Sequence, residues 1–122
     1  MAKELEVATL AGDAPTGLRR VHVSHYWPAL GGVNCFLYVA GECVSRMASG
    51  ERWQDWIGRA AACVPAWPFG TLVTLPGGEV FNCQDRGGAI VTGPDGLPWI
   101  DLLVEWPPVP FGAVVAVRVS KP

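Results

Sequence analysis

The chain has 122 residues, half of them hydrophobic and 16% charged, and a length that suits one domain with a modest core. Its 15 glycines and 11 prolines follow no short repeat, which excludes a collagen-like chain and favours short strands joined by tight turns. A formal net charge of −2 without a basic cluster argues against nucleic acid as a partner, and no run of about 18 apolar residues predicts a membrane span.

Two strands are predicted in the first quarter of the chain. Residues 3–10 and 20–26 alternate or cluster β-branched side chains, a pattern typical of strands. Residues 28–50 are rich in Gly, Ser and Cys without sustained periodicity, which indicates a long excursion that a Cys35–Cys43 bond could close. Long ordered loops of this kind shape grooves on small barrels.

The rest of the chain is predicted to be mainly strands. Residues 51–62 combine helical spacing of apolar side chains with a buried-strand run, so we expect a helical turn followed by a strand. Turns such as Pro76-Gly77-Gly78 and Gly93-Pro94-Asp95-Gly96 punctuate the remainder. The strands predicted there are residues 71–75, 79–84, 88–92, 98–104 and 112–119. This pattern is typical of an all-β barrel or sandwich.

Four cysteines, Cys35, Cys43, Cys63 and Cys83, favour two disulfides in an oxidising compartment, with three pairings possible. A zinc site is the alternative, but there is no Cys-x-x-Cys pair, and the two histidines lie in a strand-like segment away from the cysteines. A metal is therefore not expected, and no feature of the sequence demands a cofactor or a second copy of the chain. The first residues lack the basic start and apolar core of a signal peptide, so export would need a removed leader or another route such as host lysis.

Five separated segments occur in one order along the chain. The first two are Val23-Ser24-His25-Tyr26 and Met47-Ala48-Ser49-Gly50, and the third is 60–71. The last two are Asp85-Arg86-Gly87-Gly88-Ala89-Ile90 and Trp99-Ile100-Asp101-Leu102-Leu103. In this order they resemble the 3D domain, a family named for three aspartates, whose patterns "vAvDp..iPlGt", "DtGgaI" and "rIDlf" are similar to the third, fourth and fifth segments. Residues 111–117 fit the last strand of the family, so the resemblance covers about 21–119 of a single domain, 1–122.

The resemblance implies a six-stranded double-psi β-barrel with long loops and at most one or two short helices. It also implies cleavage of peptidoglycan glycan strands, as in membrane-bound lytic transglycosylases, by an extracellular or cell-wall protein that is secreted or phage-encoded. Two positions depart from the family pattern. Its first aspartate falls on Cys63, which suggests that a Cys63–Cys83 staple replaced a polar group, and Asp85 and Asp101 are sixteen positions apart because residues 92–98 lengthen the hairpin between them.

The predicted chemistry falls on Asp85 and Asp101, because carboxylates in a cleft can protonate a leaving oxygen and stabilise an oxocarbenium-like centre. By position in the family, Asp101 is the acid/base that would also activate the muramyl 6-hydroxyl, closing a 1,6-anhydro ring. Asp85 would orient Asp101 or raise its pKa. The residues expected to contact substrate are Tyr26, Ser49, Gly87, Gly88 and Trp99.

Several alternatives remain open from the sequence. Asp85 could be an Asx-turn residue and Asp101 a solvent-facing strand residue. An inverting endoglucanase on the same barrel would use the two aspartates with a water between them, at a carboxyl separation of roughly 6.5–9.5 Å. A non-catalytic polysaccharide- or wall-binding module is a further reading, because fold alone does not fix function. A Ser-His-Asp triad is not favoured, since no Gly-x-Ser-x-Gly elbow is present.

Overall fold

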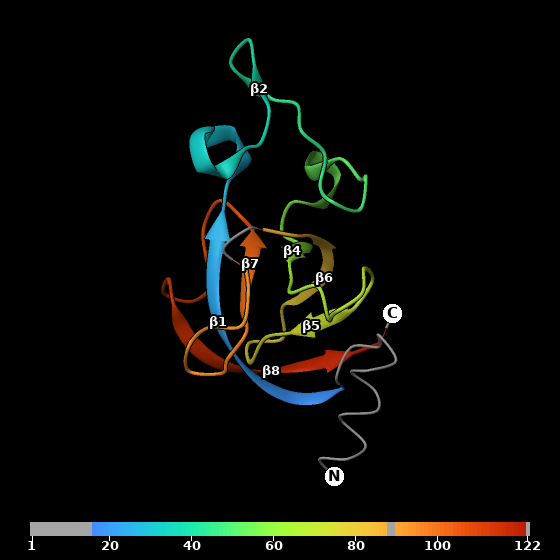
Figure 1. The fold of residues 1–122 in the computed structure, drawn as a ribbon, viewed down its shortest axis with the longest axis vertical. Coiled ribbons are helices and arrows are strands. Elements are labelled where there is room, and N and C mark those ends of the chain that lie inside the picture. Colours follow the sequence, from blue (N-terminus) through green and yellow to red (C-terminus); the bar gives the residue numbers. More distant parts are fainter. Residues whose placement is uncertain (1–15, 88–89, 122) are drawn as a thin grey trace.

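The computed structural model describes residues 16–87 and 90–121 (Figure 1). This part of the chain consists of strands, turns and three short 3₁₀ helices, none of which is long and apolar enough to cross a membrane. The elements are β1 (Gly17–Tyr26), η1 (Pro28–Leu30), η2 (Gly32–Asn34), β2 (Tyr38–Val39), β3 (Glu42–Cys43), η3 (Trp53–Trp56), β4 (Ala60–Ala62), β5 (Leu72–Thr74), β6 (Val80–Asp85), β7 (Trp99–Leu103) and β8 (Ala113–Ser120).

Six of the strands close into a barrel in the order β1-β7-β4-β6-β5-β8, and β8 pairs with β1 to complete it. The pairs β1/β7 and β4/β6 are parallel, and the other four are antiparallel. The predicted all-β, six-stranded barrel is therefore confirmed. In chain order the first three barrel strands are β1, β4 and β5, and the last three are β6, β7 and β8. If each strand of the first set is exchanged with its counterpart in the second set, the same pairs of strands remain neighbours. The barrel therefore consists of two interlocked halves of the same topology.

Alternating side chains build the core of the barrel. In β1, Val21 and Val23 are buried and face inward, and in β7, Ile100 and Leu102 do the same. Because successive residues of a strand point to opposite faces, the intervening residues of these strands face away from the interior. The inward set joins one apolar cluster with residues of β4, β5, β6 and β8.

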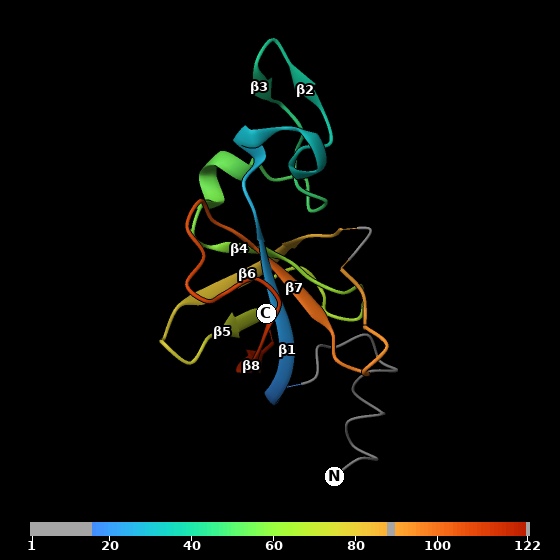
Figure 2. The same ribbon diagram turned by 90° about the vertical axis from the view of Figure 1, so that its left-hand side faces the viewer.

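Residues 28–45 leave the barrel and form what we call the stapled lobe, which contains η1, η2, β2 and β3. Figures 1 and 2 show the lobe projecting from one end of the barrel. A disulfide between Cys35 and Cys43 closes it. A second buried cluster joins its base to the barrel, and its members are Cys43, Met47, Trp53, Ala60 and Leu103.

The second disulfide links Cys63, directly after β4, to Cys83 in β6. Both of its cysteines are completely buried in the barrel core. Two disulfides in a chain of this size are compatible with an extracellular protein.

Most predicted elements match observed ones, but one prediction was wrong. The predicted strands 20–26, 71–75, 79–84, 98–104 and 112–119 correspond to β1, β5, β6, β7 and β8, and 51–62 contains η3 and β4. The predicted strand 3–10 lies outside the described residues, as do positions 88 and 89. Residues 90–92 form no barrel strand, because Val91 and Thr92 pair with Trp99 and Pro98 across a tight hairpin that leads into β7.

Candidate functional site

Four residues on adjacent strands form a row across one face of the barrel wall. Ser24 in β1 pairs with Asp101 in β7, which pairs with Ala62 in β4, which pairs with Asp85 in β6. Residues paired in register project to the same face. Since Val23, Ile100 and Ala61 belong to the barrel core, the row faces away from the interior.

Asp85 reaches this face because β6 contains a bulge. Cys83 pairs with Ala61 and Asp85 with Ala62, so Gln84 is one extra residue in β6. Strict alternation would turn Asp85 inward with Cys83, whereas the extra residue turns its side chain to the face of Ala62 and Asp101. Two strand spacings then separate the backbones of the two aspartates, about 10 Å, and the residue of β4 paired with both of them is Ala62, whose side chain is a single methyl group.

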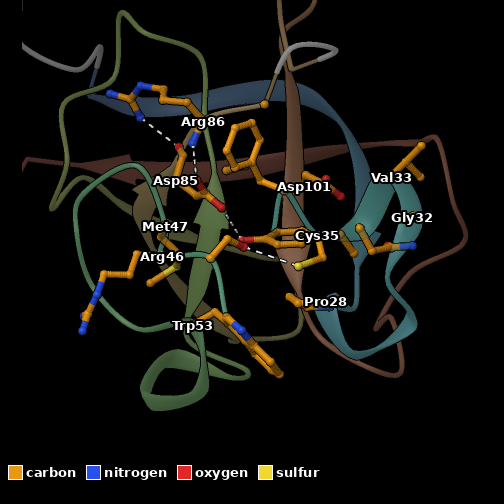
Figure 3. Close-up of a pocket in the computed structure, with 16 residues that line it drawn as sticks. Pro28, Gly32, Val33, Cys35, Arg46, Met47, Trp53, Asp85, Arg86 and Asp101 are labelled. Atoms are coloured by element: carbon orange, nitrogen blue, oxygen red, sulfur yellow. Dashed lines mark hydrogen bonds between the residues drawn. The ribbon is translucent and has the colours of Figure 1, made fainter. Parts of the chain in front are cut away.

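Both aspartates line a pocket of about 430 Å³ between the barrel and the stapled lobe (Figure 3). Tyr26, Arg86 and Gly87 line the barrel side, and the lobe contributes residues from η1, η2 and the segment around Cys35. Figure 3 shows Gly32 and Val33 on one side of the two aspartates and Arg46 on the other. The predicted pair of aspartates thus lies in one cavity.

Asp85 is fixed by three donors. Its Oδ2 accepts a hydrogen bond from the Tyr26 hydroxyl at 2.9 Å, and its Oδ1 accepts from the backbone N–H groups of Ala48 and Arg86, each at 2.9 Å. Burial, followed by the neighbouring Asp85 charge, raises the pKa of Tyr26, so its hydroxyl keeps its proton and remains a donor. Asp85 is therefore a positioned charge that ties β1, β6 and the segment around Ala48 together.

Asp101 has a different environment. Its Oδ1 accepts a hydrogen bond from the Ser24 hydroxyl at 2.9 Å. Burial raises the pKa of Asp101 from 3.8 to about 6, with a further contribution from the charge of Asp85, while Ser24 and His25 oppose the shift. A carboxyl with this pKa is partly protonated near pH 6, so it can give a proton and then take one back.

Only some of the residues predicted to contact substrate line the pocket. Tyr26 and Gly87 line the pocket, whereas Gly88 is not among the described residues. Ser49 does not line it: its Oγ accepts a hydrogen bond from the Glu51 N–H in a turn. Trp99 also lies away from the pocket, because its indole stacks on the imidazole of His22 with ring centroids 4.6 Å apart.

Cys63, where the predicted resemblance would put the first aspartate, also lies away from the pocket. It follows Ala62, points into the barrel and bonds to Cys83 in the apolar core. A carboxylate there would be buried without water, whereas a disulfide packs as an apolar group. The staple therefore occupies an interior position next to the row of site residues.

Several contributors to the site were not predicted, and Ser24, Ala62 and Ala48 illustrate why. Ser24 belongs to the first motif, and its alternation with Tyr26 could have placed both on the site face. Ala62 acts through its small size, and Ala48 acts through its backbone N–H. A backbone donor leaves no signal in residue types, so Ala48 could not have been found from the sequence.

In the described part of the chain, no three His, Cys, Asp or Glu side chains gather where they could hold a metal ion. Fold and site together define a small disulfide-bonded β-barrel protein with two unlike aspartates in a pocket. Comparison of the chain with protein-family models, with curated proteins and with solved structures gives no match. The resemblance to the 3D domain stays a prediction based on the order of its motifs.

Proposed function

We propose that the protein cleaves the glycan strands of peptidoglycan by lytic transglycosylase-like chemistry, with Asp101 as the acid/base. The observation that carries the proposal is the environment of Asp101: a carboxyl with a pKa of about 6 in a pocket, opposite a fixed Asp85. Among described residues, Asp101 Oδ2 has no hydrogen-bond partner, so this oxygen is free for a substrate.

The chemistry assigns two consecutive steps to Asp101. Protonated Asp101 gives its proton to the glycosidic oxygen as the bond from that oxygen to the muramyl C1 breaks. The resulting carboxylate takes the proton of the muramyl 6-hydroxyl, whose oxygen bonds to C1 and closes the 1,6-anhydro ring. Asp101 ends protonated, and no water is consumed. The fixed negative charge of Asp85 stabilises the positive charge that develops at the sugar between the two steps.

The contacts of Asp85 favour this route over a two-carboxylate hydrolysis. A base that activates water needs a free lone pair facing that water. Three of the roughly four lone-pair sites on the Asp85 carboxylate already accept hydrogen bonds, two on Oδ1 from backbone N–H groups and one on Oδ2 from Tyr26. Asp85 is thus better suited to a fixed charge than to a base.

Inverting glycoside hydrolysis is the second candidate. The observation in its favour is Ala62, which pairs with both aspartates and has a short side chain, because an inverting mechanism needs a water molecule between the two carboxyl groups. Either activity fits a monomer that acts in the cell wall, in remodelling or in phage-type lysis.

The test is digestion of purified peptidoglycan, with mass spectrometry of the soluble products. Wild type and Asp55→Asn, which changes an exposed aspartate of η3, are expected to release anhydro-muropeptides, and Asp101→Asn to release none. Products with a reducing end would establish the hydrolase instead. No products from a folded wild type, checked by circular dichroism, would leave a polysaccharide-binding module.

A further inference from the structure

The stapled lobe holds large apolar side chains in solvent. Leu30 is 73% exposed, Phe36 is 97% exposed and Val33 is fully exposed. Of these three, Val33 and Phe36 line the pocket that contains Asp101, whereas Leu30 does not. Exposed apolar groups that rim a cavity mark a binding surface more often than isolated surface residues do.

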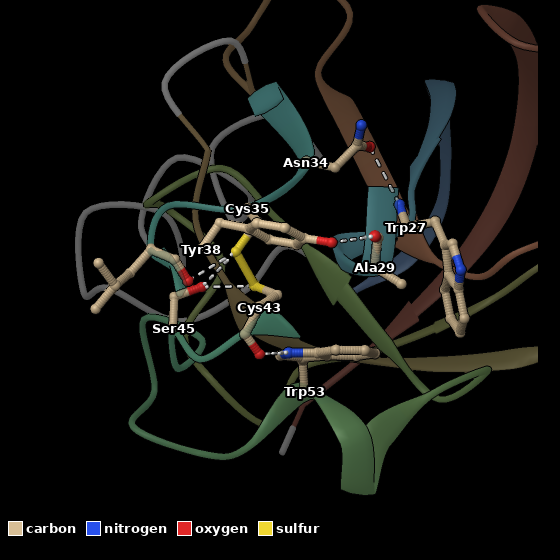
Figure 4. The surroundings of a disulfide bond; sticks show 9 residues. Trp27, Ala29, Asn34, Cys35, Tyr38, Cys43, Ser45 and Trp53 are labelled. Atoms are coloured by element: carbon tan, nitrogen blue, oxygen red, sulfur yellow. Dashed lines mark hydrogen bonds between the residues drawn. A yellow bond between two sulfur atoms is a disulfide. The ribbon is translucent and has the colours of Figure 1, made fainter. Parts of the chain in front are cut away.

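The disulfide and its neighbouring contacts restrain the backbone of the lobe next to Phe36. Phe36 directly follows Cys35, and the Cys35–Cys43 bond closes the loop on which it stands (Figure 4). The Ser45 hydroxyl lies 3.5 Å from the sulfur of Cys35 and 3.2 Å from that of Cys43. The Tyr38 hydroxyl donates to the Ala29 carbonyl at 3.2 Å, which ties β2 back to η1. Because this backbone is already restrained, little backbone conformational entropy is lost when a ligand covers the Phe36 ring.

The side of the pocket formed by Val33 and Phe36 belongs to a segment without acidic residues, lysine or arginine. No Asp, Glu, Lys or Arg occurs from residue 21 to residue 41. Recognition at Phe36 and Val33 therefore depends on apolar contact. The C–H groups on one face of a pyranose ring form an apolar surface, and an aromatic ring packs against such a surface while the sugar hydroxyls stay in water.

We infer that Phe36, with Val33 beside it, forms an apolar subsite that stacks on an uncharged sugar ring next to the bond cleaved at Asp101. The inference rests on the proposed function and specifies its substrate: a strand with at least one further sugar on the lobe side. A protein partner fits less well, because these two side chains border a pocket and not a flat outer surface.

The test measures binding in the Asp101→Asn background, which cannot cleave. The probe is peptidoglycan glycan strands freed of stem peptides, titrated by calorimetry. Phe36→Ala is expected to weaken binding roughly tenfold, and Phe36→Trp to preserve it. Leu30→Ala is the matched control, because it removes an exposed apolar side chain of the same lobe outside the pocket, and it is expected to bind within about twofold of the background.

The outcomes separate this inference from the proposed function. If wild type cleaves peptidoglycan but Phe36→Ala binds strands normally, or Leu30→Ala weakens binding equally, the subsite is wrong and the function stands. If wild type cleaves nothing, but glycan strands bind and Phe36→Ala weakens that binding tenfold, the subsite stands and the function is wrong. Strands that do not bind the folded protein overturn both.

Discussion

Replacing Asp101 with asparagine is expected to stabilise the folded protein at pH 8 and to leave its stability nearly unchanged at pH 4. Burial is the main reason that the pKa of Asp101 rises to about 6 on folding. Asparagine cannot ionise, and its carbonyl oxygen can still accept the hydrogen bond that Ser24 donates. The substitution therefore removes the cost of a buried charge while it keeps the local hydrogen bond.

The sign and size of the effect follow from linkage. Because the folded-state pKa lies above the ordinary value of 3.8, the folded protein binds the Asp101 proton more tightly, and wild-type stability falls as pH rises from about 4 to above 6. Each pKa unit corresponds to about 1.36 kcal/mol, so the ionised carboxylate costs on the order of 2 to 3 kcal/mol at pH 8.

Urea unfolding followed by tryptophan fluorescence at pH 4, 6 and 8 measures the difference. The gain of Asp101→Asn over wild type should be near zero at pH 4 and about 2 to 3 kcal/mol at pH 8. Asp55→Asn, at an exposed position, controls for the loss of one negative charge. A difference between wild type and Asp101→Asn that is the same at all three pH values would refute the raised pKa.

Two further predictions concern other contacts. Replacing both Cys63 and Cys83 with alanine should lower the free energy of unfolding by about 3 kcal/mol, since the bond closes a loop of sequence separation 20, and a loss well under 1 kcal/mol in urea unfolding would contradict this. Asp95→Asn should lower the Tm more at pH 5.5 than at pH 9. The hydrogen bond to Asp95 raises the pKa of His22. The stability that this pair contributes is therefore present below pH 6.5 and is lost as pH rises through the folded-state pKa of His22. Equal decreases in Tm at both pH values would contradict the pairing.

The parts of the fold that follow alternation could be predicted. Val21 and Val23 alternate with polar residues, and Ile100 and Leu102 alternate with Asp101, so the inward faces of β1 and β7 and the outward direction of Asp101 are contained in the residue types. Asp85 obeys no such rule. Its direction depends on Gln84 being an extra residue, and a bulge leaves no trace in a run of ordinary strand residues.

Other features depend on tertiary pairing. Residues 90–92 have the β-branched composition of a strand, yet Val91 and Thr92 pair with Trp99 and Pro98 in a local hairpin and not with a strand of the barrel wall on their own. The excursion at 28–50 was predicted, but its small β2–β3 hairpin was not, because strands of two residues are too short to show periodicity.

The position of the Cys63–Cys83 bond has a consequence for maturation. It links Cys63, which directly follows β4, to Cys83, which directly precedes the extra residue in β6, so it restrains how these two strands align. A chain whose strands slipped by one residue would turn Asp85 inward and would also carry its two thiols out of bonding range. Oxidation thus traps the alignment in which the acidic pocket exists, and an unoxidised chain lacks this check. The bond would then add to the stability of the pocket in an oxidising compartment, by the same amount that the double alanine variant is expected to lose.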